Sequence, residues 1–179
     1  EEEGNTKMVF SGDLGNYDVP ILRNPQIIED ADYLVIESTY GNRLHKEKKE
    51  NRLERFINTI DDTLERGGNV IIPSFAVGRT QEIIYDLNKY IGKYSEKLKK
   101  ILKAPVFIDS PLAISATEVF RNNPDCYDKE ARDFIESGDN PLDFPGLQFT
   151  RTAQQSKALN ERKDSCIIIA ASGMCEAGR

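Results

Sequence analysis

The chain has 179 residues, of which 39% are hydrophobic and 30% are charged, a balance typical of one soluble globular domain or of one domain with part of another. Its net charge of −6 argues against a large non-specific nucleic-acid surface, although a local basic cleft is compatible with it. No apolar run approaches the roughly 18 residues of a membrane-spanning helix, and residues 1–4 (EEEG) do not resemble the start of a signal peptide. We therefore expect no membrane partner.

The cysteines indicate a reducing compartment. Cys126, Cys166 and Cys175 are an odd number without a CxxC pair, which argues against a disulfide framework and favours the cytoplasm. We expect each of them to be a small buried apolar residue. Because the sequence opens without methionine and stops at Arg179 just after an apolar run, we also expect an excised piece of a longer protein.

Short runs rich in Val, Ile and Phe predict β-strands. Five of them are expected at residues 7–10, 33–36, 69–72, 105–108 and 166–170, with a further short strand at 147–149.

Helical patterns lie between most of these strands. Apolar residues at three- and four-residue steps predict a helix over 53–64 that ends at Gly67, and a longer helix over 83–101. Ser110 and Pro111 predict the N-cap and first residue of a third helix. Two more helices are expected, from Pro124 to about residue 138 and over 152–161.

This alternation predicts an α/β fold, a parallel twisted sheet with helices on both faces. The carboxyl ends of parallel strands meet at one edge of a sheet, where such folds bind ligands. Small polar or acidic clusters follow the five strands: Ser11-Gly12-Asp13, Glu37-Ser38-Thr39, Pro73-Ser74-Phe75, Asp109-Ser110-Pro111 and Ala171-Ser172-Gly173. We therefore expect Asp13, Glu37, Ser74 and Ser110 to converge on a common mouth, although ordinary caps and turns would leave the same pattern.

The stretch IPSFAVGRTQE at 72–82 is compatible with a phosphate site. A helix that begins after Gly78 offers unpaired N–H groups and a partial positive charge, and Arg79 adds a forked donor. The alternative is that Thr80 only caps the helix and that Arg79 points into solvent.

Two strand-end acids, Asp13 and Glu37, are candidate metal ligands or a base with its orienting partner. His45 is the single histidine. Two carboxylates and one imidazole do not complete a structural zinc site, which needs four ligands.

Read in order, these clusters resemble the β-CASP branch of the metallo-β-lactamase superfamily. That branch includes the endonuclease of the pre-mRNA 3′-end cleavage and polyadenylation complex, its archaeal and bacterial relatives, and the ribonuclease J enzymes. The amino-acid sequences of the matching stretches are most similar to those of the prokaryotic relatives. The resemblance rests on five stretches that run over essentially the whole chain: FSGDLG (10–15), VIESTYGNRLH (35–45), IIPSFAVGRTQEIIYDL (71–87), VFIDSPLAISATEVF (106–120) and IIIAASGMCEAGR (167–179).

The resemblance implies catalytic roles for Asp13, as a ligand that bridges two zinc ions, and for Glu37, which orients a catalytic histidine. It places His45 near the site without making it a ligand. Contacts with RNA phosphates are implied for Ser74, Arg79, Thr80, Ser172 and Gly173. The family's main metal motif, two histidines and an aspartate-histidine pair, is absent from this sequence. With Asp13 alone, we expect no zinc in this stretch and two zinc ions in the full-length parent.

The implied function is that of a zinc-dependent ribonuclease that hydrolyses RNA phosphodiester bonds. Residues 1–48 would be the C-terminal part of a first metallo-β-lactamase segment, and residues 49–179 would be a β-CASP domain, incomplete at its C-terminal end, that forms the RNA-binding lid. The expected partners are RNA and the missing metallo-β-lactamase domain; a homodimer is compatible with the resemblance. We expect the piece to be inactive alone. Two alternatives are a DNA-processing nuclease of the same branch and a non-catalytic nucleotide- or RNA-binding module.

Overall fold

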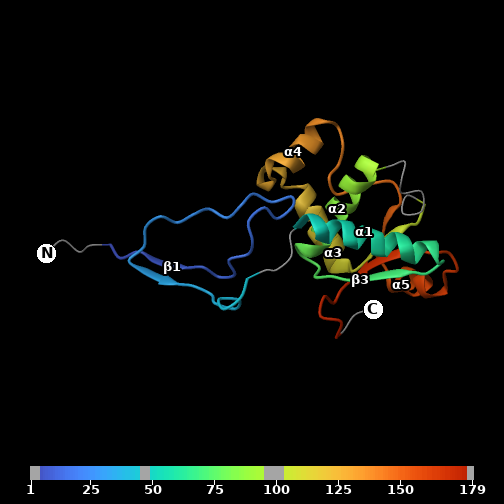
Figure 1. The fold of residues 1–179 in the computed structure, drawn as a ribbon, viewed down its shortest axis with the longest axis horizontal. Helices are drawn as coiled ribbons and strands as arrows, with labels where there is room; N and C mark the ends of the chain where they lie inside the picture. The colour runs from blue at the N-terminus through green and yellow to red at the C-terminus, as the bar shows by residue number, and fades with distance from the viewer. Residues whose placement is uncertain (1–4, 45–48, 95–102, 177–179) are drawn as a thin grey trace.

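The computed structural model describes residues 5–44, 49–94 and 103–176 (Figure 1). Residues 49–94 and 103–176 form an α/β domain, and residues 5–44, which we call the N-terminal arm, extend away from it. No helix among the described residues is long and apolar enough to cross a lipid bilayer.

The α/β domain is built on a four-stranded, wholly parallel sheet. Its strands are β3 (Val70–Pro73), β4 (Val106–Asp109), β5 (Leu147–Phe149) and β6 (Ile167–Ala170), in the order β3-β6-β4-β5. The predicted strands after residue 50 are therefore confirmed to within about a residue at each end, as is the parallel arrangement. The β-branched residues that fill β6 explain its central place, because a central parallel strand is buried on both faces.

The two faces of this sheet are covered unequally. One face packs against α1 (Lys49–Glu65), α2 (Arg79–Tyr94) and α3 (Pro111–Arg121) in the main core, to which β4 contributes Val106 and Ile108 and β6 contributes Ile167 and Ile169. The other face carries a smaller cluster, in which Leu159 of η2 (Leu159–Glu161) covers β4 and β6 residues. Edge strand β3 is less covered there, because Ile71 is 58% exposed.

Local signals set most helix ends. α1 ends just before Gly67, whose φ of +75° is the left-handed conformation that glycine adopts most easily. Ser110 caps α3, accepting a hydrogen bond from the Ala113 N–H, and Pro111 occupies the first turn. Thr152 and Gln155 form a capping box at α5 (Ala153–Ala158). Only the part of the predicted 83–101 helix up to Tyr94 lies within the described residues, because 95–102 lie outside them.

One predicted helix is wrong. The stretch from Pro124 to residue 138 divides into a short 3₁₀ helix, η1 (Pro124–Cys126), and α4 (Lys129–Glu136). Tyr127 lies between them in an extended conformation and forms an antiparallel bridge with Leu22 of the arm. Asp128 then starts α4 as its N-cap. A contact with a distant part of the chain therefore interrupts a pattern that reads locally as one helix.

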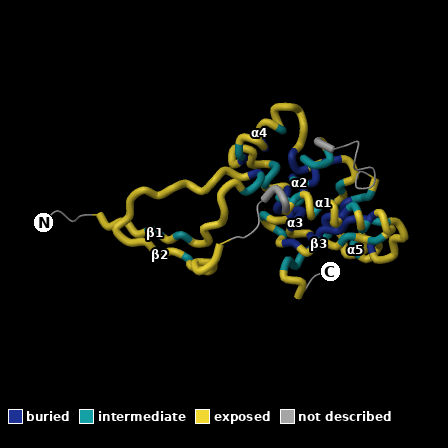
Figure 2. Tube along the Cα trace, in the orientation of Figure 1, coloured by how far each residue is buried: buried dark blue, intermediate teal, exposed yellow. Residues whose placement is uncertain are grey.

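The N-terminal arm contains a separate two-stranded parallel sheet, β1 (Met8–Phe10) and β2 (Tyr33–Val35). Both strands appear where the sequence predicts strands, but they do not join the main sheet. Figure 2 shows that nearly all of the arm is exposed, and Ile21 is the one fully buried residue among residues 5–44. The expectation that all five strand-end clusters share one sheet edge is therefore wrong.

The expectation for the cysteines is right for Cys166, which is buried in β4–β6 packing, and wrong for Cys126 and Cys175, which are exposed. Cys126 lies in η1 at the surface, and Cys175 follows the end of β6. None of the three forms a disulfide.

Candidate functional site

Three of the predicted clusters meet at the carboxyl edge of the main sheet. The register pairs Pro73 with Ala170 and Ala170 with Asp109, so the residues that follow β3, β6 and β4 are neighbours. The Ser74 N–H donates to the Ala170 carbonyl at 2.9 Å, which extends the pairing beyond the strand. We call this region the sheet edge, defined by Ser74–Thr80, Asp109–Ser110 and Ala171–Gly173.

Ser74 and Thr80 lie inside this edge, only 1% and 2% exposed. The Thr80 hydroxyl lies 3.0 Å from the Ser74 hydroxyl and donates to the Phe75 carbonyl at 2.8 Å. Their hydroxyls fasten the start of α2 to the end of β3. In this conformation, neither hydroxyl is presented to a ligand, and their contact with phosphate stays a prediction.

Gln81, which the sequence analysis did not single out, holds the loop between β3 and α2. It is fully buried, and its Oε1 accepts the Gly78 N–H at 2.7 Å. Its Nε2 reaches the Thr117 hydroxyl at 2.9 Å and the Ala76 carbonyl at 3.2 Å, so that the loop is tied to α3. Gly78 has a φ of +84°, which only glycine adopts without strain. The sequence feature that could have indicated this role is a glutamine three residues after a glycine, at the start of a predicted helix.

Arg79 is the exposed cation at the start of α2. Its side chain is 63% exposed, and its guanidinium pairs with the Glu82 carboxylate at 2.5 Å. Only the arginine side of this pair is exposed, because the Glu82 side chain is 16% exposed, so an anionic ligand would compete with Glu82 for the guanidinium. The helix start adds a partial positive charge at the same place.

The loop after β6 approaches the same edge. A Cβ added to Gly173 would lie 2.9 Å from the backbone nitrogen of Phe75 and 2.9 Å from its ring, so the two loops are in close backbone contact. Ser172 is half-buried, and its hydroxyl accepts the Met174 N–H at 3.1 Å. The Phe75 ring remains 56% exposed beside them.

Asp109 connects the sheet edge to the segments that follow β5 in the chain. Its two carboxylate oxygens accept hydrogen bonds from Thr150, at 2.5 Å, and from Ser156, at 2.9 Å. These contacts join β4 to the residue after β5 and to α5. Asp109 therefore shapes this corner of the sheet, while Ser110 begins α3.

Asp13 and Glu37 lie together at the carboxyl ends of β1 and β2 in the arm. Glu37 accepts the Leu14 N–H at 2.7 Å through Oε1 and the Thr39 hydroxyl at 2.9 Å through Oε2, while the Glu37 N–H donates to Ser11. The Leu14 N–H, and then the Thr39 hydroxyl, hold the pKa of the Glu37 carboxyl below its usual value. The ionised Glu37 thus fixes the exposed loop that carries Asp13.

A zinc site is not complete in these residues. Across residues 5–44, 49–94 and 103–176, no group of three or more His, Cys, Asp or Glu side chains is placed to hold a metal ion. His45 lies outside the described residues. Since a zinc ion needs three or four protein ligands, the described residues do not fit zinc without further ligands.

The candidate site is thus in two parts on two sheets. The arm supplies Glu37, oriented by two hydrogen bonds, with Asp13 on the loop that Glu37 holds, and the sheet edge supplies the cation Arg79 on a loop held by Gln81. The first part offers carboxylate oxygens, which suit a metal ion or a proton, and the second offers a positive charge, which suits a phosphate.

Comparison with known proteins gives a consistent assignment. Ribonuclease TTHA0252 of Thermus thermophilus is 35% identical to the chain over 177 residues, which are 99% of this chain and 39% of that protein. The RNase J-like protein of Methanocaldococcus jannaschii is 34% identical over 179 residues, again 99% of this chain and 39% of the relative. Endoribonuclease YSH1 of Saccharomyces cerevisiae is 28% identical over 186 residues, covering 22% of that protein.

The chain therefore spans about two fifths, or less, of the length of these relatives. The family model of the Beta-Casp domain matches residues 80–179. Because that match covers more than half of the sequence, the chain belongs to the β-CASP family.

Proposed function

We propose that this chain is the RNA-phosphate-binding part of a zinc-dependent ribonuclease, which hydrolyses RNA phosphodiester bonds. Membership of the β-CASP family supports this, because relatives that match almost the whole chain are named ribonuclease and endoribonuclease. The observation that carries the proposal is the exposed Arg79 at the first residue of α2, on a loop held by buried hydrogen bonds.

Arg79 would bind an RNA phosphate in place of Glu82. A guanidinium forms forked hydrogen bonds to phosphate oxygens, and the start of α2 favours the same negative charge. Gln81 and Thr80 keep the loop in place before the ligand arrives, so little conformational entropy is lost on binding. We propose that Ser172 and Gly173 line the same RNA path, because Gly173 packs against this loop at Phe75 and Ser172 directly precedes it.

We propose that Asp13 and Glu37 belong to the catalytic machinery. Glu37 is charged and already oriented by two hydrogen bonds, and it holds the loop on which Asp13 lies exposed. Asp13 would be a zinc ligand of the complete enzyme, with the remaining ligands supplied by other segments. The described residues alone do not fit zinc, so we derive no step through the metal.

The arm supports a further protein domain as a partner. Its small parallel sheet leaves Met8, Phe10, Tyr33, Leu34 and Val35 between 52% and 68% exposed. Parallel sheets are normally covered on both faces, and a two-stranded sheet is not stable alone. We propose that a metallo-β-lactamase domain covers this surface. The three cysteines form no disulfide with one another, which supports a cytoplasmic location.

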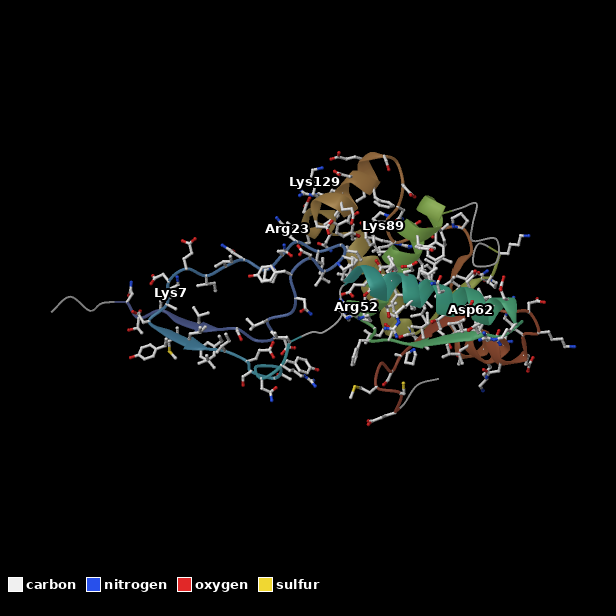
Figure 3. The ribbon with its side chains drawn as sticks, viewed as in Figure 1. Lys7, Arg23, Arg52, Asp62, Lys89 and Lys129 are labelled. Carbon is white, nitrogen blue, oxygen red and sulfur yellow. The ribbon has the colours of Figure 1, made fainter. Side chains whose placement is uncertain are left out.

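Binding of RNA by this chain tests the role of Arg79. In a filter-binding titration with a single-stranded oligoribonucleotide, Arg79→Ala should weaken binding about tenfold and lower the salt dependence by about one contact. Lys129→Ala is the matched control, since Lys129 is an exposed cation paired with Asp133 on α4 (Figure 3). Equal losses for both variants would mean that Arg79 acts only through net charge.

Cleavage tests the class of reaction. In a protein of the relatives' length that contains this chain, Asp13→Asn should abolish RNA cleavage and leave RNA binding unchanged, and a chelator should abolish cleavage as well. Asp30→Asn, at an exposed acid in the arm, is the control and should leave cleavage intact. Unchanged activity of Asp13→Asn would support a binding module, and a strong preference for DNA substrates would support a DNA-processing nuclease.

A further inference from the structure

The N-terminal arm contacts the α/β domain through one buried side chain. Ile21 has no exposed surface and belongs to the main hydrophobic core, although every other described residue of the arm is at least partly exposed (Figure 2). Tyr127, which is 2% exposed, belongs to the same core. Residues of the arm on either side of Ile21 are therefore held to the domain by it.

Backbone hydrogen bonds surround this contact. The Asp128 N–H donates to the Ile21 carbonyl at 2.6 Å, the Arg23 N–H donates to the Cys126 carbonyl at 3.2 Å, and Leu22 is bridged with Tyr127. These three contacts reach the end of η1 and the short link, Tyr127 and Asp128, between η1 and α4. That link is extended because it pairs with the arm, which explains why the helix predicted there is divided.

The segment on both sides of Ile21 is closed on itself. The Asp18 N–H donates to Asn24 Oδ1 at 2.7 Å, and Asn24 Nδ2 donates back to Asp18 Oδ1 at 3.3 Å. We call residues 18–24 the docking loop. A polar cavity of about 290 Å³ lies where this loop meets Lys89, Asp128 and Glu130 of the domain. The buried side chain of Ile21 is therefore the apolar part of a contact that is otherwise largely polar.

Ile21 also has an unfavourable backbone. Its φ is +77°, a left-handed conformation that is a genuine outlier for a β-branched residue. Such a conformation persists only where the surroundings determine it, and here they are the core and the hydrogen bonds on either side. The local sequence alone would not place an isoleucine in this way.

We propose that Ile21 is a positioning residue, which docks the arm that carries Asp13 and Glu37 onto the domain that carries Arg79. The docking loop lies between β1 and β2 in the chain, so its attachment limits how far the strand ends can move from the sheet edge. The docking itself stands on the structure alone. Its consequence for RNA cleavage rests on the proposed function.

Hydrogen exchange of backbone amides tests the docking. In this chain, Ile21→Ala should speed exchange of the Asp128 and Arg23 amides by about 30-fold or more, as expected for truncation of a buried isoleucine, while the β4 and β6 amides stay protected. Ile27→Ala is the matched control, because Ile27 lies in the same arm and is 70% exposed; it should leave both amides unchanged. Unchanged protection in Ile21→Ala would overturn the proposal.

Two further variants separate docking from general destabilisation. Ile21→Val should keep the Asp128 amide within about tenfold of its original exchange rate, because it retains a β-branched side chain in the core. Ile21→Gly removes the strain of the positive φ at this position. It should nevertheless lose the protection of the Asp128 amide as Ile21→Ala does, because the side chain makes the contact. Loss of β4 and β6 protection together with that of Asp128 in all these variants would show an ordinary core residue and overturn the proposal.

The functional consequence has its own measurement. In a protein of the relatives' length, Ile21→Ala should lower kcat for RNA cleavage about tenfold, since a small misplacement of reacting groups is costly, while binding of single-stranded RNA is retained. An unchanged kcat would remove the positioning role. If the unsubstituted protein does not cleave RNA, the proposed function fails, whereas the exchange results still decide the docking.

Discussion

The buried amide of Gln81 is the strongest single test of how the sheet edge is built. Gln81→Met retains the length and apolar contacts of the side chain but removes its hydrogen bonds. The Gly78 N–H and the Ala76 carbonyl then lose the partner that they have at 2.7 and 3.2 Å. The Thr117 hydroxyl still donates to the Ala113 carbonyl at 2.8 Å, so that pair keeps one bond.

The expected cost follows from this count. Each buried polar group left without a partner costs about 1–3 kcal/mol. Because Gly78 and Ala76 are half-buried, hydrogen bonds to water offset part of this cost. We expect the free energy of unfolding to fall by about 2–4 kcal/mol. At a urea slope of about 2 kcal/mol/M, the midpoint of unfolding should fall by about 1–2 M.

Urea unfolding followed by circular dichroism measures this difference. The control is Gln154→Met, at an exposed glutamine of α5, and its midpoint should stay within about 0.3 M of the unsubstituted chain. The loosened loop should also weaken RNA binding through Arg79. A Gln81→Met chain as stable as the control would refute the reasoning, because the hydrogen bonds would then not hold the edge.

Three further outcomes are expected. Because the Leu14 N–H holds the pKa of Glu37 below its usual value, its contact with that amide should be present at neutral pH and be lost as the pH falls through the lowered pKa. A pH titration of the Leu14 amide shift by NMR should show this loss, and Glu37→Gln should abolish the transition. Gly173→Ala should destabilise the domain by about 1–3 kcal/mol in urea unfolding, since the added carbon meets the Phe75 backbone, and an unchanged midpoint would contradict that close contact. Burial raises the pKa of Asp86 from 3.8 to about 6, so its ionised form destabilises the fold; Asp86→Asn should stabilise the chain at pH 7 by about 1–2 kcal/mol, and this gain should disappear below pH 4.

Much of the fold could be predicted because its signals are local. Runs of Val and Ile predict β3, β4 and β6, and the caps Ser110 and Thr152 start helices where the sequence places them. The parallel order follows from strands that alternate with helices, since such connections bring the strands back in the same direction. The convergence of Ser74, Ser110 and Ser172 on one edge follows from the same rule.

The sequence by itself thus determined most of the elements, the parallel sheet and the family to which the chain belongs. Only the tertiary structure decided that β1 and β2 form a sheet of their own, that Ser74 and Thr80 face inward, and that Ile21 enters the core of the domain. The physical reason is range. Capping and periodicity act within a few residues, whereas burial and strand pairing are set by contacts between segments far apart in the chain, such as Ile21 with Asp128.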